Sequence, residues 1–442
     1  MKLGTRRGMF YLSTLMFIVF GAYLVLIAQG YVLDFKTFHV VKTGAIFLDF
    51  EPTKDASLLV NGVTKKIGTT FINQGTLVKN LAPGSYHVLL SKPGYASWEK
   101  TLDVSSGLVT PRTAIRLFPK DPSSTLIAKS VSSFWLSDKE PAFQNTSGTL
   151  IYGKTEFPSL SLVSIRGTSA LARSQTSSFS LDLNDASSSL NVIKLFDTLK
   201  KRFTPPVTAQ AVHMELHPFS SNKVLISTPS ALYLLDTKRP SLDRLFLSSS
   251  SPIVDFKTTG SDVVINLKTR FVVLNLVFQT LTSYTIPSET ARDILPSSDG
   301  NTILFLNPNG FLFRYNRDTN LLRAFGEKPS EFLFSPEEKR IAERIGNTIV
   351  ITYLDPWNND LRKKPYEKTL LVLPQGTYHS LAWLDSEHLL LLKDRDLFVL
   401  EIDDAKPITM SVLARNITSF RVKDSNTLFV LTDNHELWKM DL

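Results

Sequence analysis

Two histidines and a glutamate stand at alternate positions of one predicted strand. His213, Glu215 and His217 would project from one face of that strand, because successive side chains of a strand point to opposite faces. Imidazole and carboxylate groups on one face can hold a divalent metal ion. Pro218, however, places His217 at the end of the strand, and the helical H-E-x-x-H pattern that has a known mechanism is absent. We therefore interpret the three residues as ordinary strand residues and predict no metal site.

A second polar group, Asp182, Asn184 and Asp185, contains part of the pattern of a calcium-binding loop. The glycine at the sixth position and the terminal glutamate of such a loop are missing, so a polar turn is the preferred interpretation. The chain also lacks a G-x-S-x-G elbow, a P-loop and a G-x-G-x-x-G after a strand. The sequence therefore predicts no catalytic residue, no cofactor and no metal.

Composition sets the broad class of the protein. A chain of 442 residues with 43% hydrophobic residues is long and apolar enough for two or three domains with packed cores. The net charge of +8 is a modest excess for this length, and no basic cluster with interleaved aromatic residues indicates nucleic-acid binding. Cysteine is absent, which excludes disulfides, thiolate metal ligands and a cysteine nucleophile.

An uncharged apolar run begins near the N-terminus and extends from Met9 to Val32. Its length is sufficient to cross the hydrocarbon core of a bilayer as a helix. Lys2, Arg6 and Arg7 lie on the short N-terminal side, so the positive-inside rule predicts a cytoplasmic N-terminus with the rest of the chain outside. A cleaved signal peptide is the alternative, but the run is longer than a signal h-region, and residues 27–30 make a poor cleavage site.

The stretch from Leu77 to Trp98 carries the clearest turn signals of the chain. Ala82-Pro83-Gly84 and Lys92-Pro93-Gly94 combine a residue that presets φ with one that tolerates unusual backbone angles. The β-branched and aromatic run Tyr86–Leu90 between them predicts a strand. Upstream, Asn61-Gly62 is a strong signal for a two-residue hairpin.

These residues resemble the PEGA family of small extracytoplasmic β-domains, over roughly residues 42–119. The segment 52–56 keeps only the first proline and the final alanine of the name-giving motif. The resemblance implies a β-sandwich, a location at the cell envelope, and contact with an envelope protein or surface polysaccharide. The residues that match its pattern, all structural, are Pro52, Asn61, Gly62, Leu81, Pro83, Gly84, Tyr86, Val88, Gly94, Tyr95 and Trp98.

The second half of the chain repeats. Short polar turns followed by apolar strands recur at intervals of about 38 to 40 residues, with one longer gap explained by a polar insertion at 355–368. Several short strands per repeat and no helical period indicate a β-propeller. Ser297-Ser298-Asp299-Gly300 resembles a turn of TolB-like propellers. We expect seven blades, with six or eight left open, the first passing through Phe134, 150–152 and 162–165 and the second around 190–193.

The predicted fold class is all-β with one N-terminal transmembrane helix, a small PEGA-like β-sandwich and a β-propeller. A segment near 125–129 is expected to supply the outer strand of the last blade and so remove an exposed edge. The expected function is a membrane-anchored binding or scaffold protein of the envelope, and the alternative is a propeller hydrolase or lyase acting on wall or surface glycans. The predicted parts are a cytoplasmic N-terminus (1–8), a signal anchor (9–32), a juxtamembrane linker (33–43), the sandwich (44–119), a linker with the closing strand (120–129) and the propeller (130–442).

Overall fold

The structure is a computed structural model that describes residues 3–34, 39–68, 75–249, 251–286, 289–357, 362–403 and 405–442. By its internal contacts the chain forms two units. Unit 1 comprises Met1–Pro122, Asp355–Thr369 and Phe398–Leu413, and unit 2 comprises Ser123–Leu354, Leu370–Leu397 and Ala414–Leu442. Part of the insertion predicted at 355–368, residues 358–361, lies outside the described residues.

Unit 1 begins with helix α1 (Leu3–Ala28), whose segment Gly8–Ala28 has a mean hydropathy of 2.2 and side chains exposed all around. A membrane anchor and a signal sequence share these properties. The helix ends because Gly30 adopts a φ of 82°, and its N–H donates to Ile27 O at 2.9 Å. The helix is therefore shorter than the predicted run to Val32.

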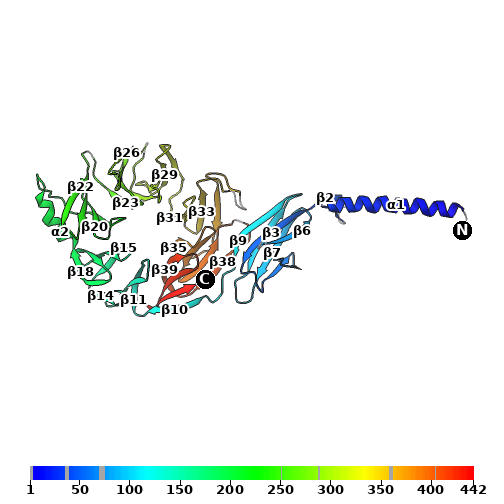
Figure 1. Cartoon of the computed structure of the whole chain (residues 1–442), viewed down its shortest axis with the longest axis horizontal. Helices are drawn as coiled ribbons and strands as arrows, with labels where there is room; N and C mark the ends of the chain where they lie inside the picture. The colour runs from blue at the N-terminus through cyan, green and yellow to red at the C-terminus, as the bar shows by residue number, and fades with distance from the viewer. Residues whose placement is uncertain are drawn as a thin grey trace. The chain divides into compact units, whose positions relative to one another are not determined.

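The segment after α1 is paired rather than a plain linker. Strand β1 (Tyr31–Asp34) pairs with β2 (His39–Lys42) in antiparallel register, with Tyr31 opposite Lys42. Figure 1 shows β2 between α1 and the larger strands of unit 1. Residues 33–34 and 39–42 of the linker predicted over 33–43 thus belong to this strand pair, and residues 35–38 lie outside the described part.

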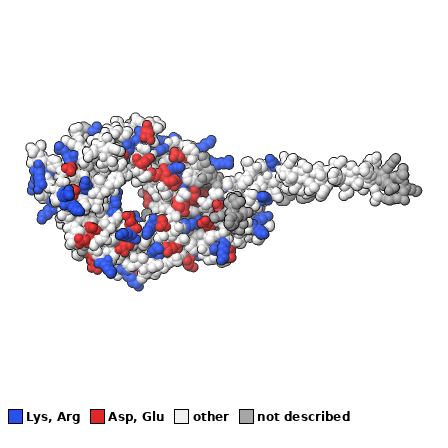
Figure 2. Space-filling model, in the orientation of Figure 1, with Lys and Arg blue, Asp and Glu red and all other residues white. Residues whose placement is uncertain are grey.

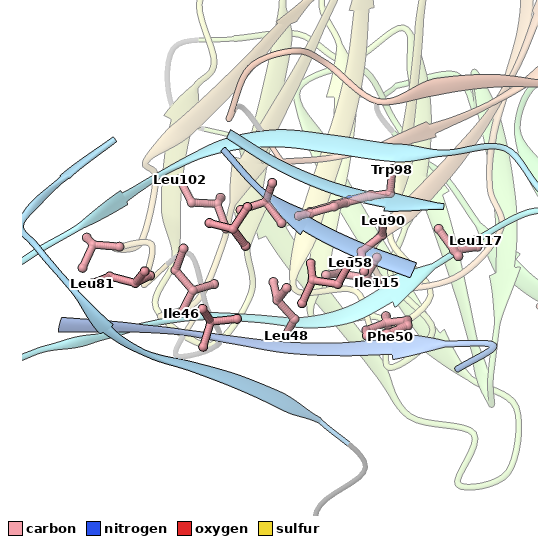
Figure 3. Close-up of a cluster of buried hydrophobic side chains, with 14 residues drawn as sticks. Ile46, Leu48, Phe50, Leu58, Leu81, Leu90, Trp98, Leu102, Ile115 and Leu117 are labelled. Atoms are coloured by element: carbon pink, nitrogen blue, oxygen red, sulfur yellow. The ribbon is translucent and has the colours of Figure 1, made fainter. Parts of the chain in front are cut away.

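Two sheets form the sandwich of unit 1. Along β8 every second residue is buried, so Trp98, Lys100, Leu102 and Val104 face inward. The apolar side chains that meet between the sheets include Ile46, Leu48, Phe50, Leu58, Leu90 and Ile115 (Figure 3). One sheet has the order β6 (Thr76–Leu81), β3 (Gly44–Glu51) and β9 (Val109–Arg116), and the other has β5 (Val63–Lys65), β4 (Ser57–Val60), β7 (Gly84–Ser91) and β8 (Trp98–Val104).

Within the described residues of the repeat region there are eight four-stranded antiparallel sheets, here called blades 1 to 8. In most blades the second and third strands are almost fully buried, as in β24 and β28, because they lie between neighbouring sheets. Blade 1 contains β11 (Val131–Leu136), β12 (Pro141–Asn145), β13 (Leu150–Tyr152) and β14 (Thr155–Phe157); blade 2 contains β15 (Ser161–Arg166), β16 (Ser169–Arg173), β17 (Ser178–Asp182) and β18 (Asp185–Asn191); blade 3 contains β19 (His213–Leu216), β20 (Lys223–Ser227), β21 (Ala231–Asp236) and β22 (Ser241–Leu247). Blade 4 contains β23 (Asp255–Thr259), β24 (Asp262–Asn266), β25 (Arg270–Asn275) and β26 (Leu281–Thr285); blade 5 contains β27 (Asp293–Pro296), β28 (Thr302–Leu306), β29 (Leu312–Asn316) and β30 (Leu321–Ala324); blade 6 contains β31 (Glu331–Phe334), β32 (Arg340–Ile345), β33 (Thr348–Tyr353) and β34 (Lys368–Val372). Blade 7 contains β35 (Tyr378–Trp383), β36 (His388–Lys393), β37 (Asp396–Glu401) and β38 (Met410–Ala414); blade 8 contains β39 (Ile417–Asp424), β40 (Thr427–Thr432), β41 (Leu437–Asp441) and β10 (Ser123–Ala128).

The blades form a propeller. Their first strands contact those of the next blades, as β11 does β15 and β39, and so form the inner wall of the ring. In blade 8 the outermost strand is β10, which pairs with β41 over Ser123↔Asp441 to Ala128↔Leu437. The all-β fold class with a propeller is confirmed, and the count of eight replaces the expected seven, within the range left open.

The miscount arose in blades 1 and 2. Residues 162–165 belong to the second blade rather than to the first, because blade 1 is completed by the short strands β13 and β14. Of residues 190–193, expected in blade 2, Leu190 and Asn191 end strand β18 of that blade, and Val192 starts helix α2 (Val192–Leu199), which is followed by a short 3-10 turn (Lys200–Arg202). Asn191 caps α2 by accepting from Lys194 N at 2.8 Å.

Candidate functional site

The residues that match the PEGA pattern lie in the turns and core of the sandwich. Asn61 and Gly62 have φ of 48° and 76°, the angles of a two-residue hairpin turn. Tyr86 Oη donates to Ala82 O at 2.9 Å and so ties the strand to the turn that contains Pro83 and Gly84. Of the remaining residues, Leu81, Val88 and Trp98 are buried in the core. Pro52 directly follows strand β3, Gly94 lies in a turn, and Tyr95 forms a β-bridge with Pro119.

A fully buried lysine stands at the centre of a polar cluster in unit 1, here called the Lys100 cluster. Lys100 is 0% exposed, and its ammonium lies 3.3 Å from Glu401 Oε2. It also donates to the backbone carbonyls of Asp403 (3.3 Å) and Ala405 (3.0 Å). A buried ammonium requires such partners, since it has lost its hydration.

Two more side chains of the sandwich complete the Lys100 cluster. Trp98 Nε1 donates to both carboxylate oxygens of Glu401, at 3.1 and 3.0 Å. Arg112 Nε donates to Asp403 Oδ2 at 3.1 Å. The cluster therefore fastens the segment Phe398–Leu413 to strands β8 and β9 within unit 1, which makes it a structural rather than a catalytic arrangement.

In unit 2 the first strands of blades 3 and 4 bring together four charged side chains, here called the inner-wall cluster. His213 Nε2 lies 3.3 Å from Glu215 Oε1 and 3.6 Å from Asp255 Oδ1. Lys257 Nζ lies 3.4 Å from Glu215 Oε1 and 3.9 Å from Asp255 Oδ2. All four remain 19–37% exposed, so they can reach a ligand at the inner wall. Figure 2 shows charged side chains bordering the hollow of the ring.

Glu215 is held in its charged form. Burial alone raises the pKa of its carboxyl, but the His213 imidazole, the Lys257 ammonium and the Thr258 N–H, which donates at 2.8 Å, together bring that pKa below its ordinary value. The cluster thus presents two carboxylates, an imidazole and an ammonium from two blades. Such a surface can pair with polar or charged groups of a ligand.

The structure separates the three residues considered as metal ligands. His217 lies beyond the end of β19, where its Nδ1 accepts from Phe219 N at 3.2 Å, so it does not join His213 and Glu215. Burial and the charges of Lys223 and Arg166 lower the pKa of His217. Within the described ranges, no group of three or more His, Asp and Glu side chains could hold a metal ion. Asp182 and Asp185 accept backbone N–H groups of Asn184 and Ser187, as in a polar turn.

Polar contacts link the turns of consecutive blades. Thr259 of blade 4 donates to Ser297 O of blade 5 at 2.5 Å, and Arg317 donates to Asp262 Oδ2 (3.0 Å) and to Gly300 O (2.8 Å). Glu338 of blade 6 accepts from Ser298 N at 2.6 Å and from Ser298 Oγ at 2.8 Å. The turn Ser297-Ser298-Asp299-Gly300 therefore links blade 5 to both of its neighbours.

Arg340 continues this series between blades 6 and 7. Its guanidinium is 0% exposed, donates to Glu337 Oε1 from Nε (2.8 Å) and Nη2 (2.5 Å), and also donates to Ser386 O. Nη1 lies 3.8 Å from Glu387 Oε2. The rings of Tyr353 and Trp383 lie 5.9 and 5.3 Å from the guanidinium carbon, within cation–π range. Here these residues are called the Arg340 cluster.

Burial raises the pKa of Glu387 to about 7, although Arg340 and His388 lower it. Between the ordinary value near 4.5 and about 7 the folded protein binds this proton and the unfolded chain does not, so stability falls as pH rises through that window. The full loss is about 3 kcal/mol. We expect Glu387→Gln to unfold at a higher temperature than the wild type at pH 8 and at the same temperature at pH 4.

Thermal unfolding of the two proteins between pH 4 and pH 8 measures this difference. The matched control is Glu327→Gln, which removes an exposed carboxylate and should leave the pH dependence unchanged. If the Glu387→Gln variant loses stability with rising pH as steeply as the wild type, Glu387 is not the source of the pH dependence.

Neither cluster of unit 2 was predicted as a site from the sequence. His213 and Glu215 were recognised as neighbours, but their partners on β23 stand about 40 residues later. Asp255 and Lys257 occupy the positions of the next repeat that correspond to His213 and Glu215. That correspondence is the one sequence signal that could have predicted the contact between the two pairs. Arg340 and Glu387 likewise occupy the turn region of consecutive repeats.

No protein-family model and no curated protein sequence matches the chain. Solved structures match its fold at low identity. BamB from Moraxella catarrhalis has a TM-score of 0.47 at 10% identity, over 73% of this chain and 97% of that one. Kluyveromyces lactis Hsv2 has a TM-score of 0.44 at 10% identity, over 65% and 99%. The β-propeller domain of Myceliophteria thermophila Cps50 (Swd1) has a TM-score of 0.39 at 13% identity, over 73% and 100%. The fold assignment rests on the eight blades themselves, and the chain is a β-propeller protein with an N-terminal apolar helix and a small β-sandwich.

Proposed function

We propose that this chain is a membrane-anchored, extracytoplasmic binding or scaffold protein of the cell envelope, with the propeller as its main recognition surface. The observation that carries the proposal is the presence, on one chain, of a closed ring of eight blades and of an apolar helical segment, Gly8–Ala28, long enough to cross a bilayer. Lys2, Arg6 and Arg7 on the short N-terminal side favour a cytoplasmic N-terminus. The resemblance of the sandwich to PEGA domains supports the envelope location.

Protease treatment of intact cells tests the topology. With an epitope tag after Leu442, we expect the tag to be lost from intact cells if the propeller faces outward. A tag that survives until the membrane is broken would overturn the proposed orientation.

Capture of partners by the full-length protein in nanodiscs tests the binding role. We expect an envelope protein or a surface polysaccharide to be retained by the wild type and by Lys238→Met, which removes an exposed charge from a turn of blade 3. Asp255→Asn/Lys257→Met should retain several-fold less, because the inner-wall cluster loses both charges of β23. Equal capture by all three proteins would show that the inner-wall cluster does not bind the partner. Capture no higher than by empty nanodiscs would contradict a binding role.

The inner-wall cluster also supports a second function, a hydrolase or lyase acting on wall or surface glycans. An imidazole between two carboxylates from different blades has the residue types of a general base and its orienting groups. In that case His213→Gln would abolish turnover of an acidic or neutral envelope glycan, while Lys238→Met would keep it. Turnover that survives His213→Gln would exclude this cluster as the catalytic centre.

A further inference from the structure

The sandwich exposes apolar side chains at one end. Leu108 is 62% exposed and Val109 is 52% exposed, in the turn that joins β8 to β9. By contrast, Val104 on β8 and Ile115 on β9 are 3% and 2% exposed. Two adjacent exposed aliphatic side chains at this end of the sandwich can contact an apolar surface.

Hydrogen bonds within unit 1 connect this turn to the end of α1. Thr43 N donates to Gly30 O at 2.7 Å, and Gly107 N donates to Thr43 O at 3.0 Å. Ser106 Oγ donates to Lys42 O at 3.1 Å. Chains joined by such bonds lie about 5 Å apart, so Gly107 lies within roughly 10 Å of Gly30. Ala45 N donates to Leu108 O at 3.0 Å, which fixes the turn on the start of β3.

The length of the apolar segment sets the depth of Gly30. The segment Gly8–Ala28 has 21 residues, which at 1.5 Å each span about 31 Å and match a hydrocarbon core of about 30 Å. Gly30 then lies in the headgroup layer, which is roughly 5–8 Å thick on each side. The exposed turn is therefore held next to that layer by backbone hydrogen bonds.

We propose that the turn Ser105–Val109 docks on the outer surface of the bilayer that α1 crosses, with Leu108 and Val109 inserted among the lipids. The inference rests on the proposed membrane anchoring. Lys42, whose side chain carbon Cε comes within 3.1 Å of the position that a Cβ on Gly107 would take, stands beside the apolar pair. Its ammonium can pair with lipid phosphate, and a basic residue beside exposed aliphatic ones is typical of interfacial segments.

The absence of cysteine allows a direct test with single nitroxide labels on the full-length protein in vesicles of phosphatidylcholine and phosphatidylglycerol. Labels are placed at Leu108→Cys, Val109→Cys, Phe17→Cys within the helix and Lys54→Cys in an exposed turn at the far end of β3. Since β3 has eight residues, Lys54 lies about 25 Å from Leu108. We expect the ratio of oxygen to water-soluble nickel-chelate accessibility to be several-fold higher at Leu108 and Val109 than at Lys54, and highest at Phe17.

The outcomes separate the inference from the anchoring on which it rests. If Phe17 is in lipid but Leu108 and Val109 are as accessible to nickel chelate as Lys54, anchoring stands and the docking of the turn is overturned. If the labels at 108 and 109 are shielded from both oxygen and nickel chelate, protein covers the turn in place of lipid. That result also overturns the docking of the turn on the bilayer. If Phe17 itself is accessible to nickel chelate, the proposed anchoring fails and the docking fails with it.

Discussion

Lys100→Met will destabilise the packing of Phe398–Leu413 within unit 1 by about 3–5 kcal/mol. The ammonium of Lys100 is fully buried, and its loss leaves the Glu401 carboxylate, 12% exposed, without its cation. The carbonyls of Asp403 and Ala405 lose a donor at the same time. Removal of one partner of a buried ion pair costs more than the pair contributes, because the remaining charge stays desolvated.

Hydrogen exchange followed by mass spectrometry measures this effect locally, which is needed because a chain of two units with an exposed apolar helix has no single unfolding free energy. We expect faster exchange in β8 and in residues 398–413, with blades 3 to 5 unchanged. Lys79→Met, at an exposed position of β6, is the matched control and should exchange like the wild type.

A double variant tests the mechanism of the Lys100 effect. Lys100→Met/Glu401→Gln should lose less protection than the sum of the two single variants, because it no longer buries an unpaired carboxylate. Additive losses, or a Lys100→Met protein with native exchange rates, would show that the Lys100 cluster does not hold the segment.

Arg340→Met is the second substitution with a large expected effect, again a loss of about 3–5 kcal/mol, here in unit 2. The guanidinium connects Glu337 of blade 6 to Ser386 and Glu387 of blade 7, and the methionine removes the cation that both carboxyl groups and the Ser386 carbonyl contact. Arg340→Lys should recover little, because an ammonium cannot reproduce the fork that bonds Glu337 while contacting blade 7 and the aromatic rings.

Thermal unfolding and exchange in β33 and β36 measure the result. Arg239→Met, which changes an exposed arginine in a turn of blade 3, is the control and should unfold like the wild type. If Arg340→Lys matches the wild type, the forked geometry is unimportant. If Arg340→Met matches it, the Arg340 cluster does not join the two blades.

The propeller could be predicted because its strands carry their own signal. The buried strands Asp262–Asn266 and Thr302–Leu306 are apolar runs after polar turns, and they recur at the blade period. Blade 2 lacks that contrast: its buried strand β16, with sequence SALAR, has small Ser or Ala residues at three of its four buried positions. Small side chains can be fully buried without raising local hydrophobicity, so the strands of blade 2 could not be placed from the sequence.

Helix α2 had a readable signal that competed with the repeat pattern. Asn191 at the cap and the apolar spacing of Val192, Phe196 and Leu199 follow the period of a helix. The inner-wall and Arg340 clusters, in contrast, depend on the angle between neighbouring blades. That angle brings Lys257 to Glu215 and Arg340 to Glu387, and no spacing along the chain encodes it.

The pairing of β10 with β41 sets the order of events when the protein is made. Strand β10 leaves the ribosome well before its partner residues Leu437–Asp441 are synthesised. About 300 residues separate them, which at roughly 5–20 residues per second is about 15–60 s of synthesis. During that time β10 has an unpaired edge, and the ring cannot close. A nascent chain of this protein is therefore open until β41 has been synthesised, and its dependence on chaperones should be greatest in that interval.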